Sequence, residues 1–160
     1  MFLETERLAL RPFVPEDMDD LAALDADPEV MRFLTQGQPV EVRPDRWAAI
    51  EKSTGDIVGW FGLRGYADGA GEVEIGFRLR RSAWGNGYAT EGSRALIAKC
   101  FAEPGIERVW GQTMAVNVAS RRVLEKVGMR YVRTFHLEWD DPLPGTERGE
   151  VEYEILRSLA

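Results

Sequence analysis

The chain has 160 residues, 44% of them hydrophobic and 29% charged, with a net charge of −7. One cysteine and one histidine exclude an intramolecular disulfide and a Cys/His zinc site, and we expect no metal. The acid excess disfavours a nucleic-acid partner and fits either simple solubility or attraction of a cationic partner such as an amine. No apolar run is long enough for a membrane helix, so we expect one cytoplasmic domain, residues 1–160.

The first half of the chain predicts strands with two short helices among them. Residues 7–13 alternate apolar and polar side chains, which indicates a strand. Pro15 opens a short amphipathic helix, and the pair Asp27-Pro28 predicts a second one that ends near Leu34.

A β-meander is predicted next. Residues 46–51 and 57–63 read as two strands joined by a hairpin turn at 53–56. Residues 72–79 (EVEIGFRL) alternate strictly, with Val73, Ile75, Phe77 and Leu79 on one face and Glu72, Glu74, Gly76 and Arg78 on the other.

The second half alternates helices and strands. We expect a helix at 88–101, a strand at 108–113, and a helix that Asn117 caps and Gly128 ends. Strands at 130–139 and 150–156 complete the chain. The order predicts an α+β fold, with a meander first and a βαβ-like middle.

A glycine loop, residues 85–89 (GNGYA), lies between a predicted strand and a predicted helix. Glycines leave backbone N–H groups uncovered, and a helix start adds free N–H groups and partial positive charge. These features suit a phosphate, with Arg80 and Arg81 as cationic support, although a plain tight turn is the alternative.

Two familiar phosphate motifs do not match this loop. A P-loop ends in Gly-Lys-Ser/Thr, whereas Tyr88-Ala89-Thr90 stands here. A dinucleotide fingerprint needs a third glycine where this chain has Thr90, and it follows the first strand of a parallel unit rather than a meander. A nucleotide-binding protein of another fold stays open as an alternative.

Four segments resemble the GNAT acetyltransferase superfamily, and within it the branch of ribosomal-protein N-terminal alanine acetyltransferases. They are Thr5-Glu6-Arg7-Leu8 through Arg11-Pro12, Thr54-Gly55 with Val58-Gly59, residues 84–91 (WGNGYATE), and Asn117 through Gly128. The likeness covers nearly the whole chain, and the last two motifs are specific when they occur in tandem.

The resemblance implies a mixed, mostly antiparallel sheet, flanked by helices and splayed between its fourth and fifth strands. Acetyl-CoA would lie in that opening. The residues implied to bind it are Phe77, Arg78, Leu79, Trp84, Gly85, Asn86, Gly87, Tyr88, Ala89, Thr90, Asn117, Ser120 and Lys126, with Lys126 at the adenosine end.

Two departures from the superfamily pattern matter. Trp84 stands where Gln or Arg is usual, as it often does in this branch. The segment 35–45 is about a helix shorter than in relatives, where it contributes to the acceptor pocket. This shortening implies either a more open acceptor site or one completed by a second subunit, in a homodimer.

Acetyl transfer to an amine needs a base, a donor to the developing oxyanion and an acid for the leaving thiolate. Glu74 is the candidate base, acting through water, with Glu72 as substitute. A backbone N–H within 77–79 is the expected oxyanion donor. Leu124 occupies the position of the superfamily's usual acidic tyrosine, so Ser120 is the candidate acid, and Asn117 would orient water or substrate.

We therefore expect an acetyl-CoA-dependent N-acetyltransferase that acts directly on a primary amine in a ternary complex. The acceptor is either a protein N-terminal α-amine or a small-molecule amine. The alternative is an inactive acyl-CoA-binding sensor or accessory module. Cys100 and His136 are expected to be structural, and Trp60, Phe61 and Trp139 to belong to the core or to line the acceptor pocket.

Overall fold

The computed structural model describes residues 2–34, 41–138 and 143–159, and in these residues eight strands form one sheet in the order β1-β2-β3-β4-β5-β6-β8-β7. The strands are β1 (Leu3–Glu4), β2 (Leu8–Arg11), β3 (Arg46–Glu51), β4 (Ile57–Arg64), β5 (Glu72–Leu79), β6 (Arg108–Met114), β7 (Arg130–Phe135) and β8 (Glu150–Leu156). The α-helices are α1 (Met18–Ala26), α2 (Tyr88–Ala102) and α3 (Val118–Lys126). Every neighbouring pair is antiparallel except β5 and β6. The predicted α+β class and mostly antiparallel sheet are confirmed.

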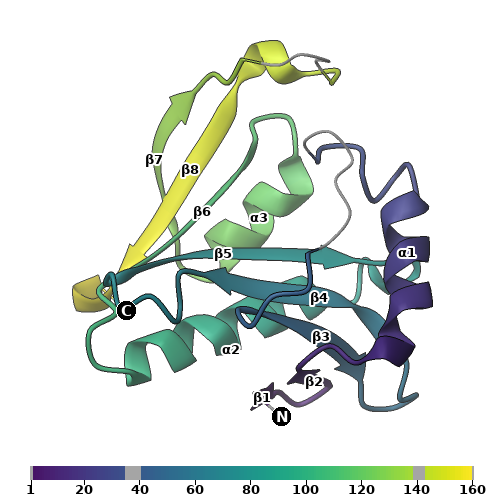
Figure 1. The fold of residues 1–160 in the computed structure, drawn as a ribbon. Helices are drawn as coiled ribbons and strands as arrows, with labels where there is room; N and C mark the ends of the chain where they lie inside the picture. Colours follow the sequence, from purple (N-terminus) through teal and green to yellow (C-terminus); the bar gives the residue numbers. More distant parts are fainter. Residues whose placement is uncertain (1, 35–40, 139–142, 160) are drawn as a thin grey trace.

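Helices cover the two faces of the sheet unequally (Figure 1). The larger core joins α2 and α3 to apolar side chains on one face, among them Phe61, Leu63 and Val73. A smaller core joins α1 to the other face through Ala48 and Trp60. On that second face, the strand positions beyond β4 carry mostly charged side chains.

Helix α2 lies unusually close to the sheet because residue 92 is glycine. A Cβ built there would fall 2.4 Å from the ring of Phe61, closer than real atoms approach. The close contact fixes the start of α2 relative to β4 and β5, and therefore fixes the glycine loop before it.

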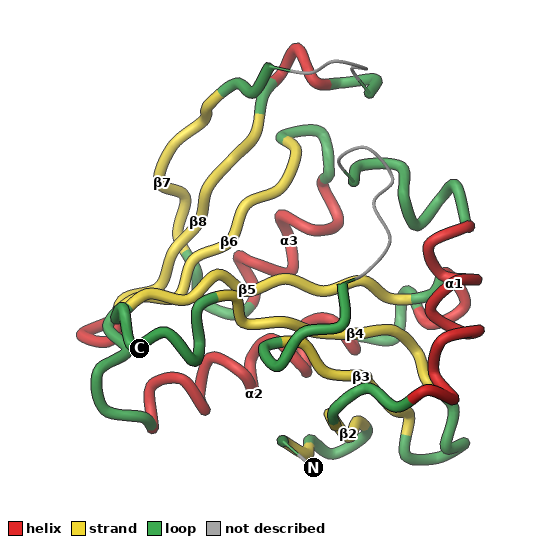
Figure 2. Tube along the Cα trace, viewed as in Figure 1, coloured by secondary structure: helices red, strands yellow, loops and turns green. Residues whose placement is uncertain are grey.

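The sheet opens between β5 and β6. Their parallel pairing joins only Glu72–Glu74 to Arg108–Trp110, after which β6 continues beside β8 as far as the pair Met114 and Glu150. Figures 1 and 2 show β6, β8 and β7 turning away from β5 as one unit. The predicted splay between the strands 72–79 and 108–113 is confirmed.

Three predicted elements differ from the structure. The first strand is shorter, at Leu8–Arg11, and the sequence pattern missed the two-residue β1. The predicted helix after Asp27 is wrong, because residues 28–34 form turns. The Asp27 carboxylate accepts a hydrogen bond from the Glu29 N–H at 3.0 Å, and such local bonding competes with a helix. Strand β7 ends at Phe135, and residue 139 lies outside the described residues.

Candidate functional site

The second half of β5 has a free edge that faces the opening. The N–H of Arg80 donates to the carbonyl of Val58 at 2.8 Å, on the β4 side. Since N–H and C=O groups alternate in direction along a strand, those of Phe77 and Leu79 point to the opposite edge. Trp84 Nε1 donates to the Leu79 carbonyl at 2.9 Å, which agrees with that direction. The remaining edge groups can pair with an extended ligand.

Glu74 lies at the vertex of the opening. It pairs with Arg64 on β4 and is the last β5 residue that pairs with β6, opposite Trp110. Burial raises the pKa of Glu74, against the opposing effects of the Arg64 charge and a hydrogen bond with Gln112. A half-buried carboxyl whose pKa lies above its ordinary value is a better proton acceptor than a solvated one.

Glu72, the substitute candidate, lies in a different environment. Its side chain is 58% exposed and forms an ion pair with Arg108 at 3.7 Å. It sits where β5 and β6 are paired, away from the open half of the strand. Glu74 is therefore better placed than Glu72 to act on a ligand in the opening.

The glycine loop follows the open end of β5. Gly85 and Gly87 both have φ of 77°, a left-handed conformation that favours glycine, and Gly87 is the N-cap of α2. The Asn86 side-chain amide donates to the carbonyls of Ala83 and Trp84 at 2.9 and 3.2 Å and so holds the loop's shape. The first N–H groups of α2 have no partner within the helix, so this end can receive an anion.

Arg7 reaches the same helix end from the N-terminal segment. The Glu91 carboxylate accepts hydrogen bonds from the Thr5 hydroxyl, the Arg7 backbone N–H and Arg7 Nε, at 2.5, 2.9 and 2.7 Å. The guanidinium lies 4.5 Å from the centre of the Tyr88 ring, and its Nη2 would be 3.5 Å from a Cβ on Gly87. Sequence reasoning gave Arg7 no role, although Arg7 and Glu91 both lie within the matched motifs.

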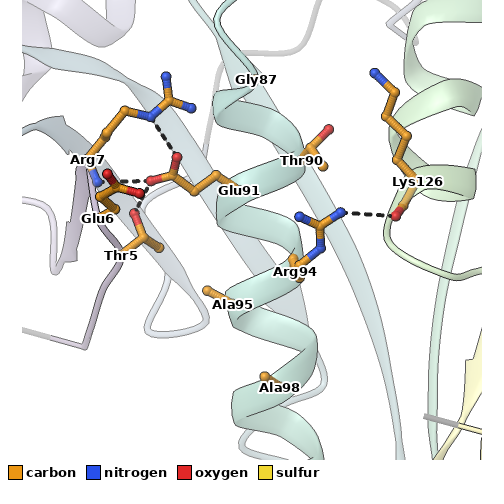
Figure 3. Close-up of a pocket in the computed structure, with 10 residues that line it drawn as sticks. All are labelled: Thr5, Glu6, Arg7, Gly87, Thr90, Glu91, Arg94, Ala95, Ala98 and Lys126. Carbon is orange, nitrogen blue, oxygen red and sulfur yellow. Dashed lines mark hydrogen bonds and ion pairs between the residues drawn. The ribbon is translucent and has the colours of Figure 1, made fainter.

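A cavity of about 580 Å³ extends from Gly87 along α2 (Figure 3). Its lining residues are Thr5, Glu6, Arg7, Gly87, Thr90, Glu91, Arg94, Ala95, Ala98 and Lys126. Figure 3 shows Arg7 on one side of α2, and Arg94 and Lys126 on the other, where Arg94 Nη2 donates to the Lys126 carbonyl at 3.2 Å. Thr90 and Lys126, both predicted to bind acetyl-CoA, thus share one cavity with the glycine loop.

Asn117 and Ser120 lie at the start of α3, just beyond the open end of β6. The Asn117 side chain accepts a hydrogen bond from the Ser120 N–H at 3.3 Å, so Asn117 is the predicted cap. Leu124 is only 3% exposed and belongs to the core. Glu74 belongs to β5, on the other side of the opening from α3.

Several predicted contributions to the site need correction. The Arg78 side chain forms an ion pair with Asp25 of α1, and its backbone N–H and C=O face β4 rather than the open edge. Its contact with acetyl-CoA stays a prediction. Arg81 binds Asp27 through two hydrogen bonds and is not available as support for the loop.

The two described aromatic residues named for the acceptor pocket, Trp60 and Phe61, are both buried. Phe61 is fully buried in the core beneath α2, so it does not line an acceptor pocket. Trp60 belongs to the α1 cluster and is 7% exposed, and Trp139 lies outside the described residues.

The sequence predicts structural roles for Cys100 and His136. Burial raises the pKa of the Cys100 thiol to about 12, and His136 Nε2 lies 3.2 Å from the Glu147 carbonyl. In the ranges 2–34, 41–138 and 143–159, no three His, Cys, Asp or Glu side chains gather as metal ligands. Over the same ranges, no helix combines the length and apolar character that crossing a bilayer requires.

Comparison with known proteins gives consistent results. A family model described as the acetyltransferase (GNAT) domain matches residues 7–130. The chain is 34% identical to an Aspergillus fumigatus protein named FsC-acetyl coenzyme A-N(2)-transacetylase, over 97% of this chain and 76% of that protein. A GNAT-family acetyltransferase from Bacillus anthracis has 25% identity and a TM-score of 0.83, over 99% of each chain. RimL, a ribosomal L7/L12 alpha-N-protein acetyltransferase solved with CoA, has 15% identity and a TM-score of 0.79, over 97% of each chain.

Proposed function

The chain belongs to the GNAT family of acetyltransferases, which use acetyl-CoA, and from this premise we propose that it acetylates a primary amine directly, in a ternary complex, with Glu74 as base. The observation that carries the proposal is the position of Glu74. Of the described β5 pairs, only those of Glu74 join it to both β4 and β6, so the free edge of β5 begins directly after it.

The residues present fit acetyl-CoA, which supplies the acetyl group as a thioester. The free β5 edge suits the extended pantetheine arm, and the loop of Gly85 and Gly87 with the start of α2 suits the pyrophosphate. The cavity beside α2 adds the cations Arg7, Arg94 and Lys126, which favour the phosphates at the adenosine end.

Each proposed catalytic group has one task. Glu74, acting through water, accepts the proton that the ammonium group must lose before its nitrogen can bond to carbon. A backbone N–H of Phe77 or Leu79 stabilises the negative charge that develops on the acetyl oxygen. Ser120 donates a proton to the sulfur as the carbon–sulfur bond breaks and regains one from solvent, and Asn117, whose side chain caps α3, orients water or substrate.

Electrostatics at the vertex support the role of Glu74. Its raised pKa makes it a stronger base, while the charge of Arg64 opposes this rise and favours the ionised form. Three other carboxylates on this face form ion pairs, since Glu72 and Glu152 bind Arg108, and Glu154 binds Arg108 and Arg130, while the charge of Glu152 contributes to the raised pKa of Glu74.

The test is an initial-rate study with acetyl-CoA and a panel of primary amines, read by mass spectrometry of the products. Direct transfer predicts intersecting lines in double-reciprocal plots and no acetylated protein when acetyl-CoA is added alone. Parallel lines with an acetyl-enzyme would instead indicate a covalent route. Acetyl-CoA binding without transfer to any amine would favour the inactive sensor.

A further inference from the structure

Gly76 leaves open space on the sheet face that carries Glu74. Alternation along β5 puts Gly76 on the same face as Glu74 and Arg78. A Cβ built on Gly76 would meet no heavy atom of the described residues within 4 Å. Its φ is not positive, so the backbone does not require glycine there. Neither packing nor conformation explains the absence of a side chain, in contrast to Gly92.

The neighbouring position on β4 is also glycine, but it is covered. Gly62 pairs with Gly76 and, on its other side, with Arg46 of β3, so the three residues form one row across the sheet. The Arg46 side chain lies over Gly62, with its Cγ 3.1 Å from a Cβ built there. The row therefore presents an arginine beside an uncovered stretch of backbone.

The Arg46 guanidinium lacks a carboxylate partner among the residues that the structure describes. It lies 4.8 Å from the centre of the Trp60 ring, and its Nη1 donates to the backbone carbonyl of Glu41 at 3.3 Å. The adjacent Asp45 carboxylate is bound by Arg43 through two hydrogen bonds, at 3.0 and 2.8 Å. Burial lowers the pKa of Arg46, as does the charge of Arg43. The charges of Asp45 and Glu41 act in the opposite direction. An anion bound at the guanidinium would offset the loss of hydration that burial causes.

Glu74 and Arg46 are close enough for one small molecule to contact both. Gly76 is two residues from Glu74, about 7 Å along β5, and Arg46 is two strands away, about 10 Å across the sheet. The Arg46 charge lowers the pKa of Glu74, so the two charged groups interact across the space above Gly76.

We infer that the acceptor amine lies over the bare backbone of Gly76 and carries a carboxylate that Arg46 binds; this inference rests on the proposed function. A guanidinium pairs well with a carboxylate, because its N–H groups match the two oxygens. A cation near the amine also disfavours the protonated ammonium, which assists Glu74 in removing its proton. The acceptor class is therefore amino acids and their derivatives with a free amine.

The first test adds side chains to Gly76. Gly76→Ala and Gly76→Val should fold and should keep the thermal shift that acetyl-CoA produces, because the added atoms meet only open space. Transfer should fall about 10-fold for alanine and about 100-fold for valine, since small displacements of a bound reactant cost that much. Calorimetry with the enzyme–CoA complex should show the same order of weakened acceptor binding. Transfer by Gly76→Val at the wild-type rate would overturn this position for the acceptor.

The second test asks whether the acceptor carries a carboxylate. Matched pairs are lysine against 1,5-diaminopentane, ornithine against 1,4-diaminobutane, and alanine against ethylamine. We expect the amino acid of a pair to have about a 10-fold lower KM, and Arg46→Gln to remove that advantage. The control Arg122→Gln, which removes the same charge from the exposed side of α3, should leave the advantage intact.

The outcomes distinguish a failure of the proposed acetyl transfer from a failure of the carboxylate assignment. A thermal shift with acetyl-CoA but no transfer to any amine contradicts the proposed function itself. Transfer that prefers the decarboxylated amines, or an unchanged preference in Arg46→Gln, overturns only the carboxylate assignment.

Discussion

The two halves of β5 share one alternating pattern but differ in what lies beside them. Glu72–Glu74 pair with β6, and Glu74 alone among them also pairs with β4, whereas the segment beyond Glu74 pairs only with β4. The paired half is closed by the ion pairs of Arg108, and the open half leaves backbone groups of Phe77 and Leu79 at an edge. The alternation of side chains thus accounts for the strand, whereas the free edge of the candidate site arises because β6 diverges from β5 after Glu74.

The largest expected effect is at the residue between the two halves. Glu74→Gln should lower kcat by about 10²- to 10⁴-fold, the usual contribution of a general base, with acetyl-CoA binding retained. Glu72→Gln, the matched change in the closed half, should stay near the wild-type rate because Glu72 is exposed and ion-paired. Steady-state kinetics measure kcat for both variants. Equal losses of kcat would contradict the proposed difference between the two halves of β5.

A smaller loss is expected at α3, across the opening. Ser120→Ala should lower kcat about 10- to 100-fold if the hydroxyl supplies the leaving-group proton, while its N–H still bonds to Asn117. An acyl donor whose thiol is a better leaving group should reduce this loss, so a series of acyl donors with thiols of lower pKa provides the measurement. An unchanged kcat in Ser120→Ala would show that Ser120 is not the general acid.

The glycine loop at the end of the open half should respond in binding rather than in turnover. Gly87→Ala and Gly69→Ala both force alanine into a left-handed conformation, at φ of 77° and 68°, and each should cost about 1–2 kcal/mol of stability. Only Gly87→Ala adds a methyl group beside the Arg7 guanidinium, so only it should weaken acetyl-CoA binding, by about 10-fold. Calorimetric titration distinguishes the pair, and equal affinities would remove the loop from the binding site.

The smallest effect concerns stability and pH. The pKa of Glu74 is higher in the folded protein than its ordinary value, so the folded state holds the proton more tightly. Ionising Glu74 therefore destabilises the fold as the pH rises through that pKa. Glu74→Gln should unfold at a slightly higher temperature than the wild type near pH 7, and the difference should vanish near pH 4. A variant less stable than the wild type at neutral pH would show that the Glu74 carboxylate stabilises the fold.

Much of this arrangement could be predicted from the sequence. Strict alternation placed β5 at the residues it occupies, and the cap at Asn117 and the stop at Gly128 located α3, because these signals depend on local backbone chemistry. The opening between β5 and β6 was predicted from the family resemblance, because no local sequence pattern indicates where two strands stop pairing.

What the sequence could not supply are the contacts between distant segments. The ion pair of Arg78 with Asp25 and the hydrogen bonds of Arg7 with Glu91 join residues more than 50 positions apart. The open space above Gly76 is likewise a property of three adjacent strands. The false helix after Asp27 had the right cap and proline, but its capping side chain closed a local turn instead.

The most direct test of the central claim is residue-resolved amide hydrogen exchange along β5, with and without acetyl-CoA. The N–H groups of Phe77 and Leu79 face the open edge, whereas those of Gly76 and Arg78 face β4 by the same alternation. We predict that acetyl-CoA slows exchange at Phe77 and Leu79 and leaves Gly76 and Arg78 nearly unchanged. The contradicting result is that acetyl-CoA slows exchange at other residues but not at Phe77 and Leu79. That result would show that the donor binds without using the open half of β5.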